Sequence, residues 1–206
     1  MQPDDLKRGD GFGGAVAISG ETAIIGARLA QADSHQYAGS AYIFQLENGV
    51  WQQKQKLQPT DLQYGDNFGN AIAISGEVAI VGAYGVDAQS CPDTGAAYIF
   101  QRENGVWQQK QKLQPADLQR RDGFGCSVAI QGQVAVVGTS DAGSVYIFQL
   151  ENGVWQQKQK LYSPEAQPKD CFGYAVALSK GVVITGAHNA DAQGRPYAGS
   201  AYIACP

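Results

Sequence analysis

Short segments with a strand-like pattern of apolar and polar positions recur along the whole chain. In the first of them, residues 13–19 alternate small and branched side chains, which is the period of a half-buried β-strand. Residues 22–27 are apolar throughout and predict a strand that is buried on both faces. Two further strands are predicted from Ser40 and from Val50, and the Asn-Gly pair between them is a strong hairpin signal. The pattern therefore predicts a meander of four antiparallel strands.

This unit occurs four times. A Phe-Gly pair and a Tyr-Ile pair mark each copy, with the aromatic residues at Phe12, Phe68, Phe124 and Phe172 and at Tyr42, Tyr98, Tyr146 and Tyr202. The segment ENGVWQQKQKL is intact three times, from Glu47, Glu103 and Glu151. Its Gln- and Lys-rich strand is typical of a protected outer sheet edge. Repeated units of roughly 50 residues that run from an apolar inner strand to a polar outer strand favour a β-propeller over a β-sandwich.

We therefore predict an all-β fold, a four-bladed β-propeller of four-stranded antiparallel blades in a single domain over residues 1–206. The blades are expected near residues 10–59, 66–115, 122–163 and 170–206. The last blade is expected to lack its outer strand in this chain, because the fourth unit stops after the third-strand motif AYIACP. The first residues match the tail of a fourth-strand motif, so the chain can also be part of a longer array. The open edge of the last blade is expected to be a contact surface.

Composition and charge narrow the classes of partner. The net charge is −4, without a basic face or tail, which argues against nucleic acid as the main partner. No apolar run reaches the roughly 18 residues that a membrane span needs. No Cys-x-x-Cys pair occurs among Cys91, Cys126, Cys171 and Cys205. Thiols are the expected state, and one or two disulfides in a secreted protein are the alternative.

The motifs resemble bacterial FG-GAP repeats of the second type, relatives of the repeats in the integrin α-subunit propeller. The markers are Phe-Gly in the first strand, Ile25-Gly26-Ala27 and its copies at the end of the second, Gly-x-Ala-Tyr-Ile-Phe in the third, and Trp followed by Lys-Leu in the fourth. The resemblance covers essentially the whole chain. It implies an integrin-like propeller and leaves the function open, because this fold carries many functions.

The resemblance also raises the question of calcium. In the integrin-type repeat, a longer Asp-rich loop between the first two strands binds calcium. Here the corresponding links are Ser19-Gly20-Glu21, Ser75-Gly76-Glu77, Gln131-Gly132-Gln133 and Lys180-Gly181-Val182. Calcium takes six to eight oxygen ligands, and a tight turn with at most one carboxylate cannot supply them. We expect a hairpin turn with Gly at positive φ, and neither a metal site nor a cofactor.

The long and variable links all emerge on one side, which we call the top face. These are the links between the second and third strands (28–39, 84–95, 140–143 and 188–199) and those between blades. Variable loops on a rigid scaffold are where function usually lies. The expected ligand-binding residues are Asp33, His35, Tyr37, Asp87, His188, Asp191, Arg195 and Tyr197, and Arg28 opens the first link. No catalytic residue is assigned, because the chain has no Gly-x-Ser-x-Gly, His-Glu-x-x-His or Walker-type motif.

Several sets of residues allow two interpretations of their role. The carboxylates beside the Phe-Gly pairs either cap turns or ring one axial cation; they are Asp10, Asp66, Asp122 and Asp170. His35 and His188 are either solvated loop residues or a metal or acid–base pair, if a closed ring makes their blades neighbours. Cys126 and Cys171 can form a disulfide or a metal contact between adjacent blades. The tryptophans of one repeated slot favour packing between blades over a ligand platform; they are Trp51, Trp107 and Trp155.

Together these patterns predict a noncatalytic binding or adhesion module, secreted or on the cell surface, which contacts a protein or carbohydrate ligand through its top-face loops. A second copy of the chain or a partner strand is expected at the open edge of the last blade. The alternative is a small enzyme or metal-binding protein with its site at the axial top opening.

Overall fold

The computed structural model describes residues 1–32, 34–88, 91–162 and 170–205, which form four antiparallel sheets. Blade 1 contains β1 (Phe12–Ser19), β2 (Thr22–Ala27), β3 (Ser40–Glu47) and β4 (Val50–Leu57). Blade 2 contains β5 (Ile72–Ser75), β6 (Val78–Ala83), β7 (Ala96–Glu103) and β8 (Val106–Leu113). Blade 3 contains β9 (Ser127–Gln131), β10 (Val134–Gly138), β11 (Ser144–Glu151) and β12 (Val154–Tyr162). Blade 4 contains β13 (Phe172–Ser179), β14 (Val182–Ala187) and β15 (Ser200–Ala204).

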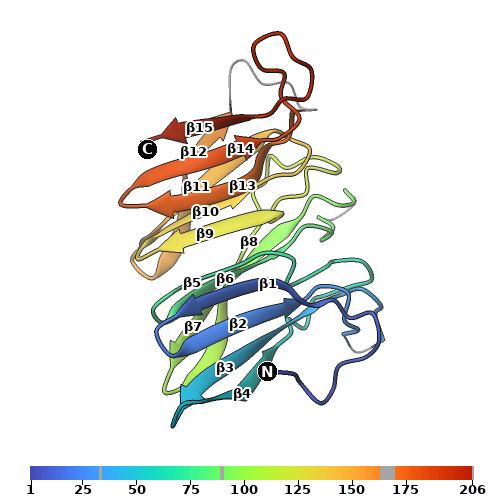
Figure 1. Cartoon of the computed structure of the whole chain (residues 1–206), viewed down its shortest axis with the longest axis vertical. Helices are drawn as coiled ribbons and strands as arrows, with labels where there is room; N and C mark the ends of the chain where they lie inside the picture. The colour runs from blue at the N-terminus through green and yellow to red at the C-terminus, as the bar shows by residue number, and fades with distance from the viewer. Residues whose placement is uncertain (33, 89–90, 163–169, 206) are drawn as a thin grey trace.

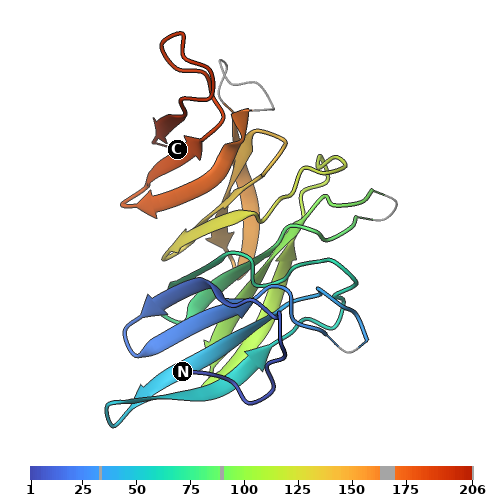
Figure 2. The ribbon, with the colours of Figure 1, turned by 45° about the vertical axis from the view of Figure 1, so that its right-hand side comes forward.

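The predicted all-β, four-bladed propeller is confirmed, and the last sheet has three strands as expected. The inner strands follow one another, with β1 against β5, β5 against β9 and β9 against β13. Blades 1 and 4 lie at opposite ends of the molecule, so the blades form an open arc (Figures 1 and 2). The described part of the chain contains no helix long and apolar enough to cross a membrane.

The link between the first two strands of each blade is the predicted two-residue turn. Gly20, Gly76 and Gly132 have φ near +60° at these turns, which a residue with a Cβ rarely adopts. Each turn is also tied to the next blade. The Ser19 hydroxyl accepts a hydrogen bond from the Gly76 N–H (3.1 Å), and Ser75 accepts one from Gly132 (3.0 Å). The short turns therefore fix the spacing of neighbouring blades.

The spaces between blades hold the apolar core. In each blade the Phe of the Phe-Gly pair packs edge-on against the Tyr of the third strand, as Phe68 does against Tyr98 with ring centroids 5.4 Å apart. Neighbouring outer strands are joined by a glutamine amide that bonds both backbone groups of a tryptophan, as Gln111 does with Trp155 (2.8 Å to each). Trp107 and Trp155 are buried between blades, which confirms the packing interpretation of this slot.

Candidate functional site

Two positions in each blade border the axis at the top face. One position directly follows the Phe-Gly pair, and the other lies two residues after the glycine of the second strand. The first is occupied in the four blades by Gly14, Asn70, Cys126 and Tyr174, and the second by Arg28, Tyr84, Ser140 and His188. Because equivalent inner strands lie side by side, side chains from different blades meet here.

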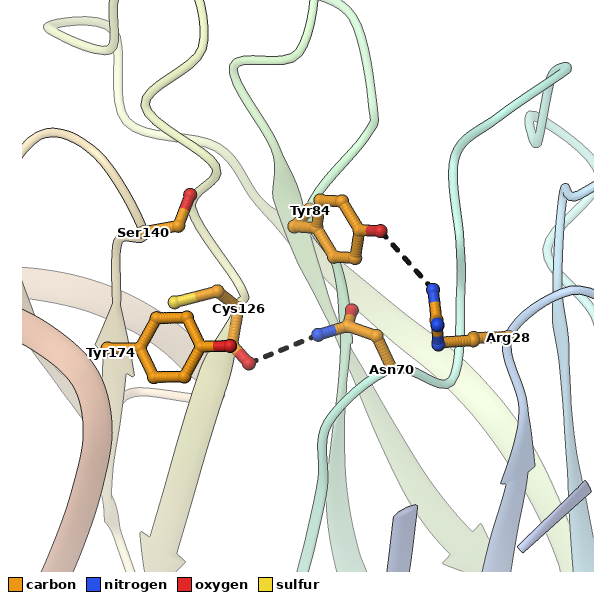
Figure 3. A pocket seen from close by; sticks show the side chains of 6 residues that line it. All are labelled: Arg28, Asn70, Tyr84, Cys126, Ser140 and Tyr174. Carbon is orange, nitrogen blue, oxygen red and sulfur yellow. Dashed lines mark hydrogen bonds between the residues drawn. The ribbon is translucent and has the colours of Figure 1, made fainter. Parts of the chain in front are cut away.

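Six of these residues line one pocket of about 440 Å³, shown in Figure 3; they are Arg28, Asn70, Tyr84, Cys126, Ser140 and Tyr174. They come from all four blades, and the pocket opens at the top of the inner strands. This volume lies within the range of small-molecule sites, which is roughly 300–1,000 Å³.

Hydrogen bonds between blades position the polar side chains of this axial pocket. The Arg28 guanidinium donates to the Tyr84 hydroxyl (3.4 Å). The Asn70 amide donates to the backbone carbonyls of Gly125 and Cys126 (3.1 Å each). The Asn70 carbonyl oxygen is buried and has no hydrogen-bond partner within the described residues. A buried acceptor of this kind is stabilised when a ligand donates to it.

The blade 4 side of the pocket is aromatic. Tyr174 is 55% exposed, and its ring meets the His188 ring at a centroid distance of 4.5 Å. Beside it, burial raises the pKa of the Cys126 thiol to about 12, so this cysteine is protonated at neutral pH. The pocket therefore offers an aromatic face, hydroxyl and amide groups, one guanidinium group and an unreactive thiol.

The repeated carboxylates cap turns, as the first of their two interpretations predicts. Asp10, Asp66 and Asp122 each accept a hydrogen bond at 2.7 Å from the N–H of the residue three positions earlier. Asp66 is buried, and its desolvation raises the pKa of its carboxyl group to about 6. Desolvation also raises the pKa of Asp122. These three carboxylates thus serve the turns before the inner strands.

Metal and disulfide interpretations find no support in the geometry. Within residues 1–32, 34–88, 91–162 and 170–205, no three His, Cys, Asp or Glu side chains are placed to hold a metal ion. All four cysteines, including Cys126 and Cys171, carry thiols rather than disulfides. His35 and His188 belong to blades at opposite ends of the arc, so the closed ring that would bring them together is not formed within one chain.

The predicted loop residues are mostly engaged in the loops themselves. The carboxylates of Asp87 and Asp191 accept hydrogen bonds from the N–H of Asp93 (2.9 Å) and Tyr197 (3.0 Å), six residues later. His35 and Arg195 lie at the loop tips, where each forms a backbone bridge to the alanine three residues earlier.

Tyr37, with φ +58°, uses its carbonyl to accept the N–H of Asn67 in the next blade. Of the predicted residues that the structure describes, His188 contacts the axial pocket, through Tyr174. Asp33 lies outside the described residues. A ligand-binding role for these loop residues stays a prediction.

Sequence reasoning missed Asn70, Tyr84, Ser140 and Tyr174 as site residues. The repeats carry part of the signal, because the position after each Phe-Gly pair differs in every blade between neighbours that recur almost unchanged. The second axial position opens the variable link, where the next residue also differs in every blade (Leu29, Gly85, Asp141 and Asn189). A residue type that a repeat's packing requires is the same in each copy, so the positions that differ in all four copies are free to serve a ligand.

The comparisons with known proteins bear on the family and the fold. The family described as FG-GAP repeat matches residues 1–44, 51–100, 107–148 and 155–204. No curated protein matches the sequence. A solved structure, the periplasmic gluconolactonase PpgL of Pseudomonas aeruginosa, is similar with a TM-score of 0.55 and 15% sequence identity. The match covers 86% of this chain and 54% of that one, so the chain spans about half of that protein. At this identity the likeness shows the fold alone.

Proposed function

Because this chain belongs to the FG-GAP repeat family, whose blades form its propeller, we propose that it is a noncatalytic module that binds a carbohydrate in the axial pocket. One observation carries the proposal. Two positions whose residues differ in all four repeats converge from four blades on one pocket of ligand size.

The chemistry of the pocket suits a sugar. Tyr174 is exposed on the pocket wall and offers a ring face to the apolar C–H face of a pyranose. The Ser140 and Tyr84 hydroxyls can donate to or accept from sugar hydroxyls, and the Asn70 carbonyl oxygen can accept from one. A few polar groups on a partly apolar wall are the usual composition of a small-molecule site.

Arg28 narrows the ligand to an acidic sugar. It is the charged member of the six lining residues, and its bond to Tyr84 uses one of five N–H donors. A guanidinium group binds a carboxylate through two parallel hydrogen bonds. A uronic acid is therefore the preferred ligand class.

The lining residues favour binding over turnover. A nucleophile needs a neighbouring base. The six lining residues include neither a carboxylate nor an imidazole, and the His188 imidazole beside the pocket contacts the Tyr174 ring. The raised pKa of Cys126 keeps its sulfur protonated and weakly nucleophilic.

The test measures binding of uronic-acid and neutral oligosaccharides, first on an array and then by calorimetry. Tyr174→Ala and Asn70→Ala should each weaken binding by about tenfold or more, which corresponds to about 1.4 kcal/mol. Arg28→Gln should remove the preference for the acidic sugar. The matched control is Tyr197→Ala, which removes an exposed tyrosine from a loop of the same blade and should leave affinity unchanged.

Three results would contradict the proposal. Binding that is lost in Tyr197→Ala and kept in the pocket variants would place the site on the loops. An array on which no glycan is bound would show that the ligand is not a carbohydrate. Hydrolysis of a sugar lactone or glycoside that disappears with a pocket variant would make the protein an enzyme.

A further inference from the structure

The two ends of the arc expose apolar side chains on their sheet faces. On blade 1, Val16 and Ile18 project from β1 with 67% and 64% of their surface exposed. On blade 4, Ile184 of β14 and Ile203 of β15 are 45% and 69% exposed. We call the first surface the head face (Val16, Ile18) and the second the tail face (Ile184, Ile203).

At the interfaces inside the chain, the tail-face positions are buried and the head-face positions are partly buried. The tail-face pair corresponds to Ile24 and Ile43 in blade 1, to Ile80 and Ile99 in blade 2, and to Val136 and Ile147 in blade 3; all six are at most 4% exposed. The head-face pair corresponds to Ile72 and Ile74 of blade 2, which pack into the core that contains Ile24 and Ile43. The head and tail faces are therefore the two halves of one interface that the chain already forms three times.

A glycine at each end of the arc indicates that a further blade of this kind would fit there. At the internal interfaces, a Cβ on Gly26, Gly82 or Gly138 would come within about 2 Å of a glycine carbonyl oxygen in the next blade. The equivalent residue of blade 4 is Gly186, where a Cβ would meet its nearest atom, a side-chain carbon of its own blade, at 3.7 Å. Its counterpart on the head face, Gly13, has nothing within 4 Å of a Cβ. Nothing among the described residues of one copy requires a glycine at position 186, whereas a blade docked on the tail face would require one.

The hydrogen bonds that join the turns of neighbouring blades, which we call the rim hydrogen bonds, show the same complementarity. In each internal interface the last residue of the inner strand accepts, through its side chain, a hydrogen bond from the turn N–H of the next blade, as Gln131 does from Lys180 (2.6 Å). Ser179 holds the accepting position at the tail end, and the N–H of Gly20 holds the donating position at the head end. Both residues are exposed.

We propose that a second copy of this chain covers both ends, with the tail face of each copy packed on the head face of the other. The contact is heterologous, and two such contacts close a ring when the rotation per copy is half a turn. The open arc leaves the head and tail faces of one copy uncovered for such contacts (Figures 1 and 2). The apolar pairs, the glycines and the rim bonds of the internal interfaces would then repeat between copies. The inference does not depend on the ligand of the axial pocket.

Sedimentation equilibrium on the purified chain tests the assembly. The expected mass is twice the 21.9 kDa of one copy, and a monomer at all concentrations up to about 100 µM would overturn the proposal. A head variant, Val16→Asp with Ile18→Asp, and a tail variant, Ile184→Lys with Ile203→Lys, alter side chains that are exposed in one copy, so each should fold. Each variant alone should be monomeric, and their equimolar mixture should dimerise. A head variant that still dimerises alone would show a symmetric contact instead and overturn the head-to-tail arrangement.

Gly186→Ala gives a second, milder test. The added methyl group fits the isolated chain but lies where the next blade's glycine carbonyl would approach, so we expect an unchanged circular dichroism spectrum and a dimer dissociation constant raised by about tenfold or more. Gly138→Ala is the matched control, because the same methyl group at an internal interface should lower the stability of the monomer itself. A Gly186→Ala protein that dimerises as the wild type does would contradict the proposed interface.

Discussion

At the scale of single residues, Asp66 closes a turn with a carboxylate whose charged form is disfavoured by burial. The side chain is 3% exposed and closes its turn by accepting the Gln63 N–H at 2.7 Å. Desolvation outweighs this bond and raises the pKa to about 6, above the value of 3.8 expected in the unfolded chain. The folded state therefore binds the proton more tightly, and stability from this group is present at low pH and lost as pH rises through 6.

Asp66→Asn tests this linkage, because the amide oxygen can still accept the Gln63 N–H without carrying charge. We expect the variant to gain stability over the wild type as pH rises from 4 to 7, by up to about 3 kcal/mol. Urea unfolding at a series of pH values measures the difference. Asp10→Asn makes the same substitution in the more exposed turn of blade 1 and serves as the control. A difference between Asp66→Asn and wild type that stays constant from pH 4 to 7 would refute the assigned shift.

The same scale explains which site residues the sequence revealed. Repetition identified the capping aspartates and the interblade tryptophans, since packing and turn geometry impose the same residue in each blade. It did not identify Asn70 or Tyr174, because their position carries a different residue in each blade and lies next to strongly patterned neighbours. His188 was predicted because it lies on a variable top-face link.

At the scale of strands, alternation and turn chemistry were sufficient to predict the strands of each blade. They were not sufficient to predict irregular pairing between those strands. In blade 1 the register shifts between Ile43 and Phe44, so that Lys54 is an extra residue in β4. Lys54 forms an ion pair with Glu47 at 2.7 Å, and blades 2 and 3 repeat both features. A bulge changes the backbone and leaves the apolar pattern of the facing strand intact, which is why the sequence did not reveal it.

The outer edge of β15 gives the prediction at this scale. In blades 1 to 3 the third strand pairs with a fourth, whereas in the described part of blade 4 β15 pairs only with β14. An unpaired edge can bind an added strand. A synthetic peptide ENGVWQQKQKL, the fourth-strand sequence of blade 1, should bind this edge with its last leucine opposite Ala201, as Leu57 lies opposite Ala41.

At a hundredfold excess over its dissociation constant, the peptide should stabilise the chain by about 2.7 kcal/mol, measured as a rise in the thermal midpoint. The control is the same peptide with proline at alternate positions, which cannot pair. Equal midpoints with the two peptides would show that the edge does not accept a strand.

At the scale of the whole molecule, the repeats predicted the number and order of blades but not the curvature of the arc. Blade count follows from the markers along the chain, whereas curvature depends on the angle between neighbouring sheets, which packing at sites such as Gly82 and Gly125 determines. The exposed head and tail faces follow from that angle. The sequence alone could not distinguish a closed ring from an open one.

Hydrogen exchange tests the consequence of this openness. In the described part of a single copy, blade 4 has three strands and an apolar face that no other blade covers. Its amides should therefore exchange faster in dilute solution than those of β6 and β7, which have blades on both sides. If the ends dock between copies, raising the protein concentration should slow exchange in β14 and β1 together and leave β6 and β7 unchanged. The tail variant at the same concentrations should show no such protection. Protection in β14 without protection in β1 would mean that the tail face binds some surface other than the head face.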